Sequence, residues 1–299
     1  MADPDRLPAD AVLLNPASLW AISDFVIHDG RDAPPQFRFD PPGLSRFLAR
    51  IDAVRDGDIV CLKANLCRTF FAIAFPRLRA RIVLMTVEGD WPAPGPHWPR
   101  LDDDRIIRWF GQNCDLAAPH PKFVPMPLGV AAPHWPHGDQ QALLRAHRAM
   151  PAAGDRKLLA HASFHLTFSH PERAEVWSKL QRRTGVVFEP GRLPPEELWF
   201  RHAGYAFAVS PRGAGMDCHR TWEALALLTI PIVKRSPLDP AFQGFPVAMV
   251  EDWDEVTIAA MARWRAAMAD AFTAGMLRRL TAPYWTSQVL AAAASAKGG

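Results

Sequence analysis

One loop of the chain contains an unusual number of groups that bind anions. It follows the apolar run at residues 205–209, and it carries two glycines, two arginines and a histidine: Arg212, Gly213, Gly215, His219 and Arg220. Glycines let the backbone approach a ligand closely. We expect Asp217 to be the N-cap of the following helix, which places His219 and Arg220 in its first turn. A cation there opposes the helix dipole by about 0.3–1 kcal/mol, whereas a phosphate would be stabilised, so the pattern indicates a phosphate site.

Glu223 is the one carboxylate in that helix, whose other residues from Trp222 to Leu228 are almost all apolar. A buried carboxylate must be paired or strongly hydrogen-bonded. The two hydroxyls of a nucleotide ribose would supply two donors, one turn beyond the phosphate site. An ion pair with Arg220 or Lys234 is the alternative.

The same stretch carries a resemblance to a known family. Residues 211–225 read PRGAGMDCHRTWEAL, and residues 229–233 read TIPIV. This resembles the nucleotide-sugar signature of two-domain GT-B glycosyltransferases, in particular the exostosin-like branch with its S-P-x-G-x-G-x-D-x-H-R-x-W-E-A-L pattern. The resemblance is dense over residues 204–239 and weak elsewhere. Thr229 departs from the Gly or Cys that is usual in the family.

The resemblance implies roles for these residues. Glu223 would hold the ribose of a nucleotide-diphosphate-sugar donor. The glycines and basic residues of the loop would face the diphosphate: Arg212, Gly213, Gly215, His219 and Arg220. No metal is implied, because GT-B enzymes usually manage the diphosphate charge with basic residues and helix dipoles. We therefore interpret the acidic run Asp102–Asp104 as a solvated turn rather than a metal site.

A second polar turn runs from residue 161 to residue 173, after another apolar run. This turn resembles the pattern of the family, which is Phe-Ser-x-x-Thr followed by Arg. The resemblance implies that three more residues contact the donor: Ser163, Thr167 and Arg173. A zinc site is the alternative, because the turn also contains His161, His165 and His170. Neither a cysteine nor an acid pair accompanies them, which disfavours zinc.

Sugar transfer with inversion needs a base that takes the proton of the acceptor hydroxyl. Residues 86–92 (TVEGDWP) follow a predicted strand and resemble a Thr-His-x-x-Asp-x-x-x-Pro segment of the family, with Val87 in place of His. Ligands of open α/β sheets lie beyond the carboxyl ends of the strands. Asp90 is therefore our first candidate for the catalytic base and Glu88 the second, with a solvated loop acid as the alternative.

The elements that would position these residues alternate along the chain. Apolar runs suited to buried parallel strands alternate with helical segments, which predicts an α/β fold. We expect two Rossmann-like domains of the GT-B type facing across a cleft. Residues 1–152 would form the N-terminal, acceptor-side domain and residues 153–299 the nucleotide-sugar-binding domain, with C-terminal helices bracing the first domain.

Composition excludes several classes of protein. The 299 residues include 34 basic and 31 acidic ones, too balanced for a nucleic-acid binder. Four scattered cysteines suit a reducing compartment. The first residues lack the features of a signal peptide, and no apolar run approaches the roughly 18 residues of a membrane span. We expect a cytoplasmic protein, with peripheral contact with the inner face of the membrane left open.

The sequence therefore predicts a glycosyltransferase that moves a sugar from a nucleotide-diphosphate-sugar to a hydroxyl of a glycan or glycolipid acceptor. It would act with inversion and without a metal or other cofactor, and the resemblance implies bacterial surface polysaccharide synthesis as its context. A nucleotide-sugar epimerase of the same fold is one alternative. The other is a non-catalytic nucleotide-sugar-binding module, which the Val87 departure favours.

Overall fold

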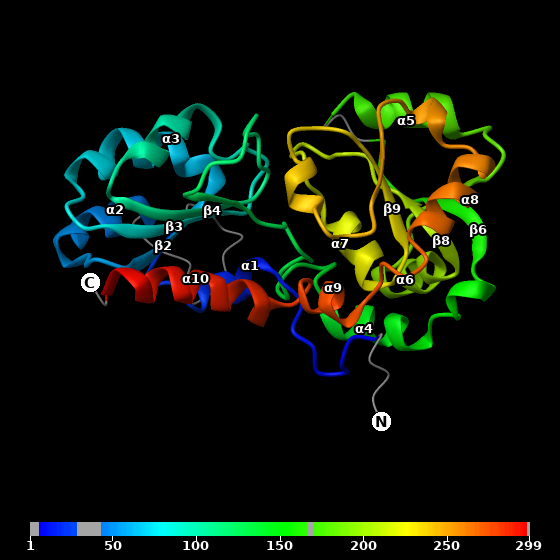
Figure 1. Cartoon of the computed structure of the whole chain (residues 1–299), viewed down its shortest axis with the longest axis horizontal. Coiled ribbons are helices and arrows are strands. Elements are labelled where there is room, and N and C mark those ends of the chain that lie inside the picture. Colours follow the sequence, from blue (N-terminus) through cyan, green and yellow to red (C-terminus); the bar gives the residue numbers. More distant parts are fainter. Residues whose placement is uncertain (1–5, 29–42, 167–169, 298–299) are drawn as a thin grey trace. The chain divides into compact units, whose positions relative to one another are not determined.

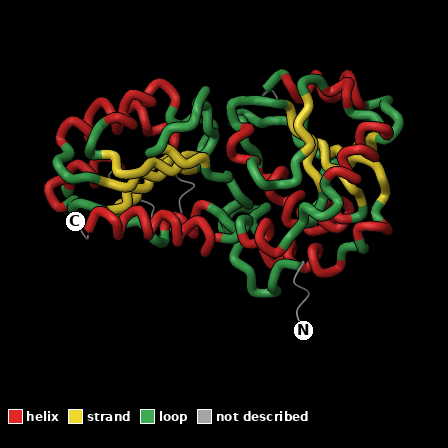
Figure 2. The backbone as a smooth tube through the Cα atoms, in the orientation of Figure 1, coloured by secondary structure: helices red, strands yellow, loops and turns green. Residues whose placement is uncertain are grey.

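The computed structural model describes residues 6–28, 43–166 and 170–297. The chain forms two compact units. The first unit comprises Asn15–Leu128 together with Ala282–Gly299, and the second comprises Met1–Leu14 together with Gly129–Thr281. Figure 2 shows a sheet flanked by helices in each unit. The chain therefore passes between the units more than once, and the expected boundary between residues 152 and 153 falls inside the second unit.

The helix α4 (Gln140–Ala149) explains why residues 129–152 belong to the second unit. Asp139 caps this helix by accepting a hydrogen bond from the Ala142 N–H. Its buried face, which includes Leu143 and Leu144, packs on α6 (Pro195–Ala203) and α7 (His219–Ala226) of the second unit. Apolar burial of this kind is the main force that fixes a helix to a domain.

The first unit is built on five parallel strands in the order β1-β2-β3-β4-β5. Their bounds are β1 (Phe25–Ile27), β2 (Asp58–Lys63), β3 (Ile82–Val87), β4 (Ile106–Gly111) and β5 (Phe123–Pro125). Every residue of β3 is buried, as expected of a central strand that is covered on both faces. The apolar character of residues 18–27 predicts one strand there, but β1 begins only at Phe25, because a capping box at Asn15 and Ser18 starts the helix α1 (Pro16–Trp20).

Strand order explains the position of the C-terminal helix α10 (Ala282–Lys297). Because the five strands follow one another in chain order, right-handed crossovers place all their connections on one face of the sheet. The other face needs a separate cover, and α10 packs there on β2, β3 and β4, with Trp285, Val289 and Ala293 buried. Figure 1 shows α10 and α1 on one side of this sheet and α2 (Gly43–Ala49) and α3 (Cys67–Thr69) on the other. The predicted bracing helix is therefore α10.

The second unit contains another five-stranded parallel sheet, in the order β10-β9-β8-β6-β7. Its strands are β6 (Lys157–Ala162), β7 (Val186–Phe188), β8 (Tyr205–Val209), β9 (Ile230–Lys234) and β10 (Ala248–Val250). Its helices also include α5 (Glu172–Leu180), α8 (Ile258–Ala267) and α9 (Ala274–Arg278). The core of this unit includes Phe207, Ile232 and Trp253, all inaccessible to solvent. No helix in the described part of the chain combines the length and the apolar character that crossing a bilayer would need.

Candidate functional site

The strand order of the second sheet reverses between β6 and β8. From β6 the chain moves outward to β7, then returns to the opposite side of β6 to form β8 and β9. Ala162, the last residue of β6, pairs with Val209, the last residue of β8, so the loops that follow begin side by side. Open α/β sheets bind ligands at this kind of switch point. The fold thus brings together the two polar segments that the sequence singled out, residues 161–173 and the loop after β8.

The loop after β8 is held by the buried carboxylate of Asp217. Its oxygens accept hydrogen bonds from the Trp222 indole N–H at 2.8 and 2.9 Å and from the Cys218 N–H at 2.8 Å. Because the carboxylate is used in this way, the N-cap is Cys218 rather than the expected Asp217, and α7 begins at His219. Cys218 caps without a side-chain hydrogen bond. This leaves the first turn of α7 suited to an anion.

Arg173 and Arg220 connect the two loops. Arg173 Nε donates to the Arg212 carbonyl at 3.0 Å, and Arg220 Nε donates to the Ser163 carbonyl at 2.8 Å. Burial, and then the charge of Arg220, lowers the pKa of Arg173. A side chain at Gly213 would lie 3.1 Å from Arg173 Nη2, so glycine leaves room for this guanidinium.

Arg212 has a buried donor without an acceptor in the described part of the chain. Its Nε is buried and donates to no described acceptor, while Nη2 donates to the Ala214 carbonyl at 3.3 Å. Neither Arg212 nor Arg220 forms an ion pair with a carboxylate in the described part of the chain. A buried donor without an acceptor costs about 1–3 kcal/mol, so this position is suited to a ligand oxygen.

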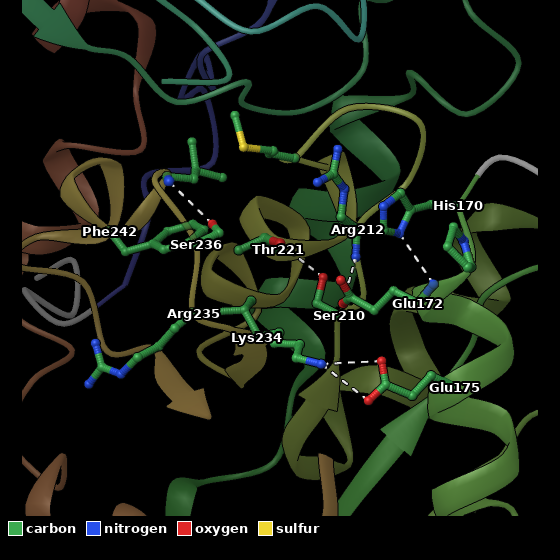
Figure 3. Close-up of a pocket in the computed structure, with 14 residues that line it drawn as sticks. His170, Glu172, Glu175, Ser210, Arg212, Thr221, Lys234, Arg235, Ser236 and Phe242 are labelled. Atoms are coloured by element: carbon green, nitrogen blue, oxygen red, sulfur yellow. Dashed lines mark hydrogen bonds and ion pairs between the residues drawn. The ribbon is translucent and has the colours of Figure 1, made fainter. Parts of the chain in front are cut away.

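A cavity of about 380 Å³ lies beside the loop (Figure 3). It is lined by Ser210, Arg212 and Thr221, together with Glu172 and Lys234 from neighbouring elements. The hydroxyls of Ser210 and Thr221 are hydrogen-bonded at 2.9 Å, and Glu172 accepts from the Arg212 N–H at 3.3 Å. Burial raises the pKa of Glu172. The cavity is thus lined by hydroxyls and cations, one of which is Arg212 with its unpaired Nε.

Glu223 is oriented by a tryptophan that the sequence did not indicate. Trp199 on α6 is buried, and its indole N–H donates to Glu223 Oε2 at 3.1 Å. Glu223 is half-buried as a residue, and burial of its carboxylate raises its pKa against the opposing effects of the Trp199 hydrogen bond and the Arg220 charge. Neither alternative partner pairs with it among the described residues. Lys234 binds Glu175 at 3.1 and 3.2 Å, and Arg220 donates to Ser163.

His219 lies in the first turn of α7, and its Nδ1 is 2.8 Å from the Gly129 carbonyl. Since a carbonyl only accepts, Nδ1 carries the proton. In the neutral ring Nε2 is then an acceptor, and it would donate to a phosphate only when the imidazole is protonated.

Two of the remaining predicted donor-binding residues lie in the same two loops, and a third lies outside the described residues. Ser163 is half-buried directly after β6, and Gly215 is buried in the loop after β8. Thr167 lies outside the described residues. The zinc alternative gains no support, because His161 points into a buried network with His202 and Glu189, at 3.3 Å from each. No group of three potential metal ligands occurs within residues 6–28, 43–166 and 170–297.

The first unit holds its own polar cluster at the carboxyl ends of its strands. Glu88, directly after β3, accepts from His28 Nε2 at 2.8 Å, and its N–H donates to Gln112 Oε1 at 2.9 Å. The side chains of His28 and Glu88 are 1% and 11% exposed. Glu88 has φ +50°, a left-handed conformation that costs roughly 1–2 kcal/mol for a residue other than glycine. Asp90, by contrast, is exposed.

Two further polar groups have structural partners in this unit. Asn113 has φ +52°, and its side chain donates to the Gly89 carbonyl at 3.0 Å, so it stabilises a turn. Asp103 pairs with Arg105 at 2.8 Å, which lowers the pKa of Asp103 to about 2. The acidic run is therefore part of an ion-paired turn.

The chain matches no protein-family model and no curated protein. Among solved structures, it is similar to the UDP-forming α,α-trehalose-phosphate synthase of Burkholderia xenovorans in complex with glucose-6-phosphate, with TM-score 0.44, 13% identity and coverage of 82% of this chain and 74% of that one. For the Burkholderia vietnamiensis synthase these values are 0.48, 13%, 86% and 78%. For the E. coli trehalose-6-phosphate structure bound with UDP-2-fluoro glucose they are 0.42, 10%, 97% and 89%. Likeness at this level establishes no activity for this chain.

Proposed function

We propose that the protein is a glycosyltransferase that uses a nucleotide-diphosphate-sugar donor. The observation that supports this most is that two features occur together at the switch point of the second sheet. A buried Arg212 Nε has no acceptor, and the Glu223 carboxylate, fixed by Trp199 at one oxygen, lies one helical turn beyond Arg220. Three residues of α-helix rise about 4.5 Å, a spacing that suits a diphosphate next to a ribose.

In this proposal the second unit binds the donor. Glu223 Oε1 accepts hydrogen bonds from the ribose hydroxyls, while Oε2 stays with Trp199. Basic residues and loop backbone neutralise the diphosphate, including its charge as leaving group. The residues with this role are Ser163, Thr167, Arg173, Arg212, Gly213, Gly215, His219 and Arg220. No metal or other cofactor takes part in the proposed reaction.

The chemical step replaces one bond of the anomeric carbon. The acceptor hydroxyl oxygen forms a bond to this carbon, the bond to the diphosphate oxygen breaks with its electron pair, and the hydroxyl proton passes to a base. Glu88 and Asp90 are the proposed candidates for the base of an inverting reaction. Glu88 has the built environment that a base requires, since His28 and Gln112 fix its position. More specifically, we propose that the protein is an exostosin-like enzyme that takes part in bacterial surface glycan synthesis and acts from the cytoplasm.

Product analysis tests the reaction type. The full chain is incubated with nucleotide-diphosphate-sugars, with and without a mixture of saccharide acceptors, and free nucleoside diphosphate and new glycosides are measured. Acceptor-dependent release of nucleoside diphosphate, lost in Glu223→Ala, is expected. Conversion of the sugar nucleotide without any acceptor would identify an epimerase instead. Binding of the donor without turnover under any condition would identify a binding module.

A further inference from the structure

A second cavity, of about 530 Å³, lies at the opposite edge of the second sheet. Its wall includes Ala206 and Ile230, near the starts of β8 and β9, whereas the candidate donor site follows the ends of these strands. The two sites lie at opposite ends of these strands. Strands of five residues span roughly 13–17 Å, and this length separates the sites. The volume lies within the range of about 300–1,000 Å³ that is typical of small-molecule sites.

Three arginines from distant parts of the sequence line this cavity: Arg6, Arg156 and Arg265. Arg156 is 5% exposed, and its Nη1 donates to the Leu227 and Leu228 carbonyls at 2.8 and 2.7 Å, beyond the C-terminus of α7. Arg156 Nε donates to the Pro151 carbonyl, and Nη2 donates to no described acceptor. The guanidinium is thus held rigidly while one of its nitrogens remains available.

Two of these arginines, Arg156 and Arg265, have backbone carbonyls rather than carboxylates as their described partners. Arg265 is half-buried and donates to the Ala153 carbonyl at 3.0 Å. Neither Arg156 nor Arg265 forms an ion pair with a described carboxylate, and the exposed Asp270 is the acid in the lining. Burial, followed by the charges of Arg6 and Arg265, lowers the pKa of Arg156 to about 10. A buried guanidinium without a carboxylate partner is costly, and an anion beside Arg156 would relieve this cost.

The remaining wall is apolar. Met150 and Ile230 are buried in it, and Met268 and Phe272 are half-buried. Methionine side chains adapt to the shape of a bound group. A lining that combines positive charge with an adaptable apolar surface matches an anion that carries an apolar body.

We propose that this cavity is a binding site for an amphiphilic anion, a carboxylate or phosphate joined to a short aliphatic chain. The anionic group lies against Arg156 Nη2 and Arg265, and the chain lies on Met268 and Phe272. The site is independent of the proposed donor site, so it does not depend on the proposed function.

Calorimetry with the full chain tests the proposal, with decanoate and decyl phosphate as probes. Decanol, which lacks the charge, and inorganic phosphate, which lacks the chain, are the ligand controls. Arg265→Gln is expected to weaken binding of the amphiphilic anion about tenfold, because a charge-assisted hydrogen bond is lost. Phe272→Ala is also expected to weaken binding of the amphiphilic anion, because the aliphatic chain loses a contact surface. Arg263→Gln, an exposed arginine on the same helix that does not line the cavity, should leave it unchanged.

Binding of either probe with this pattern of variants and controls supports the proposal. The probe that binds more tightly, decanoate or decyl phosphate, identifies the head group as carboxylate or phosphate. The proposal is overturned if neither probe binds or if decanol binds as tightly as decanoate. It is also overturned if Arg265→Gln binds as tightly as the parent chain. Thermal unfolding of each variant verifies that a loss of binding is not a loss of fold.

Discussion

The Trp199 indole N–H donates to Glu223 Oε2 at 3.1 Å, from the buried side of α6 to the half-buried side of α7. The bond fixes the plane of the carboxylate and assigns one of its oxygens to the protein. The other oxygen is then the acceptor for a ligand. Trp199 is therefore a positioning residue in the proposed site, and it acts through Glu223.

Trp199→Phe tests this positioning. Phenylalanine keeps most of the apolar volume but lacks the N–H, so the carboxylate loses its fixed orientation. We expect affinity for a nucleoside diphosphate to fall roughly tenfold, because a hydrogen bond to a charged group contributes about 1.5–3 kcal/mol. Affinity for the matching 2′,3′-dideoxynucleoside diphosphate, which lacks the diol, should be weak and unchanged by the substitution. Trp177→Phe, a partly exposed tryptophan on α5, is the matched control. Equal loss for both nucleotides would indicate a merely structural role for Trp199.

Glu223 also predicts how stability depends on pH. Burial raises its pKa in the folded chain above the ordinary value of 4.5. The folded state therefore holds the proton more tightly than the unfolded state, and stability from this group is present below pH 4.5 and lost as pH rises through the raised pKa. Glu223→Gln removes the ionisation but still accepts from Trp199. We expect this variant to unfold at a higher temperature than the parent at pH 7, with the difference shrinking at pH 4. A lower unfolding temperature at pH 7 would contradict the cause assigned to the shift.

The two candidate bases are separated by conservative substitutions. Glu88→Gln keeps the shape of the side chain but cannot take a proton at neutral pH. Loss of a general base typically lowers kcat by about 10²–10⁴-fold, and we expect this loss for Glu88→Gln with donor affinity unchanged. Asp90→Asn, at an exposed position, should have a small effect. Steady-state kinetics with a saccharide acceptor measures both. The reverse order would make Asp90 the base, and full activity in both variants would remove the base from this segment.

The backbone conformation of Gly129 is one that a residue with a side chain would adopt only with strain. Its φ is +71°, and a Cβ there would lie 2.1 Å from the Leu14 carbonyl oxygen. Its carbonyl also accepts from His219 in the candidate site. Gly129→Ala should lower the free energy of unfolding by at least about 1–2 kcal/mol, since left-handed backbone is strained for alanine. Gly154→Ala, where no atom lies within 4 Å, is the control. Equal urea midpoints for the two variants would contradict this reading of Gly129.

The sequence predicts well those features that depend on residues close together in the chain. The strand, loop, helix and strand between residues 204 and 239 follow from one apolar run, two glycines and a second apolar run, and the structure has β8, α7 and β9 there. The parallel sheets follow from the alternation of apolar runs and helices. Local chemistry also explains why residues 18–27 do not form one strand, because the Asn15–Ser18 capping box that starts α1 is itself a sequence signal.

The rest depends on contacts between distant residues, which periodicity does not encode. Trp199 and Glu223 are 24 residues apart, and His28 and Glu88 are 60 apart. Arg156 reaches the end of α7 across 71 residues. The boundary at Leu128 and Gly129 depends on α4 packing against α6 and α7, a preference that its own amphipathic pattern does not specify.

Binding of nucleoside diphosphates tests the central claim most directly. Calorimetry with uridine, guanosine and adenosine diphosphates should find at least one that binds the parent chain. Glu223→Ala and Arg212→Ala should each weaken it about tenfold or more, while Glu196→Ala, an exposed acid on α6, should not. Arg212→Ala should remain folded, since it removes a buried donor that has no described acceptor. Unchanged affinity in both site variants, or binding of no nucleoside diphosphate by the parent chain, would contradict the assignment of the donor site.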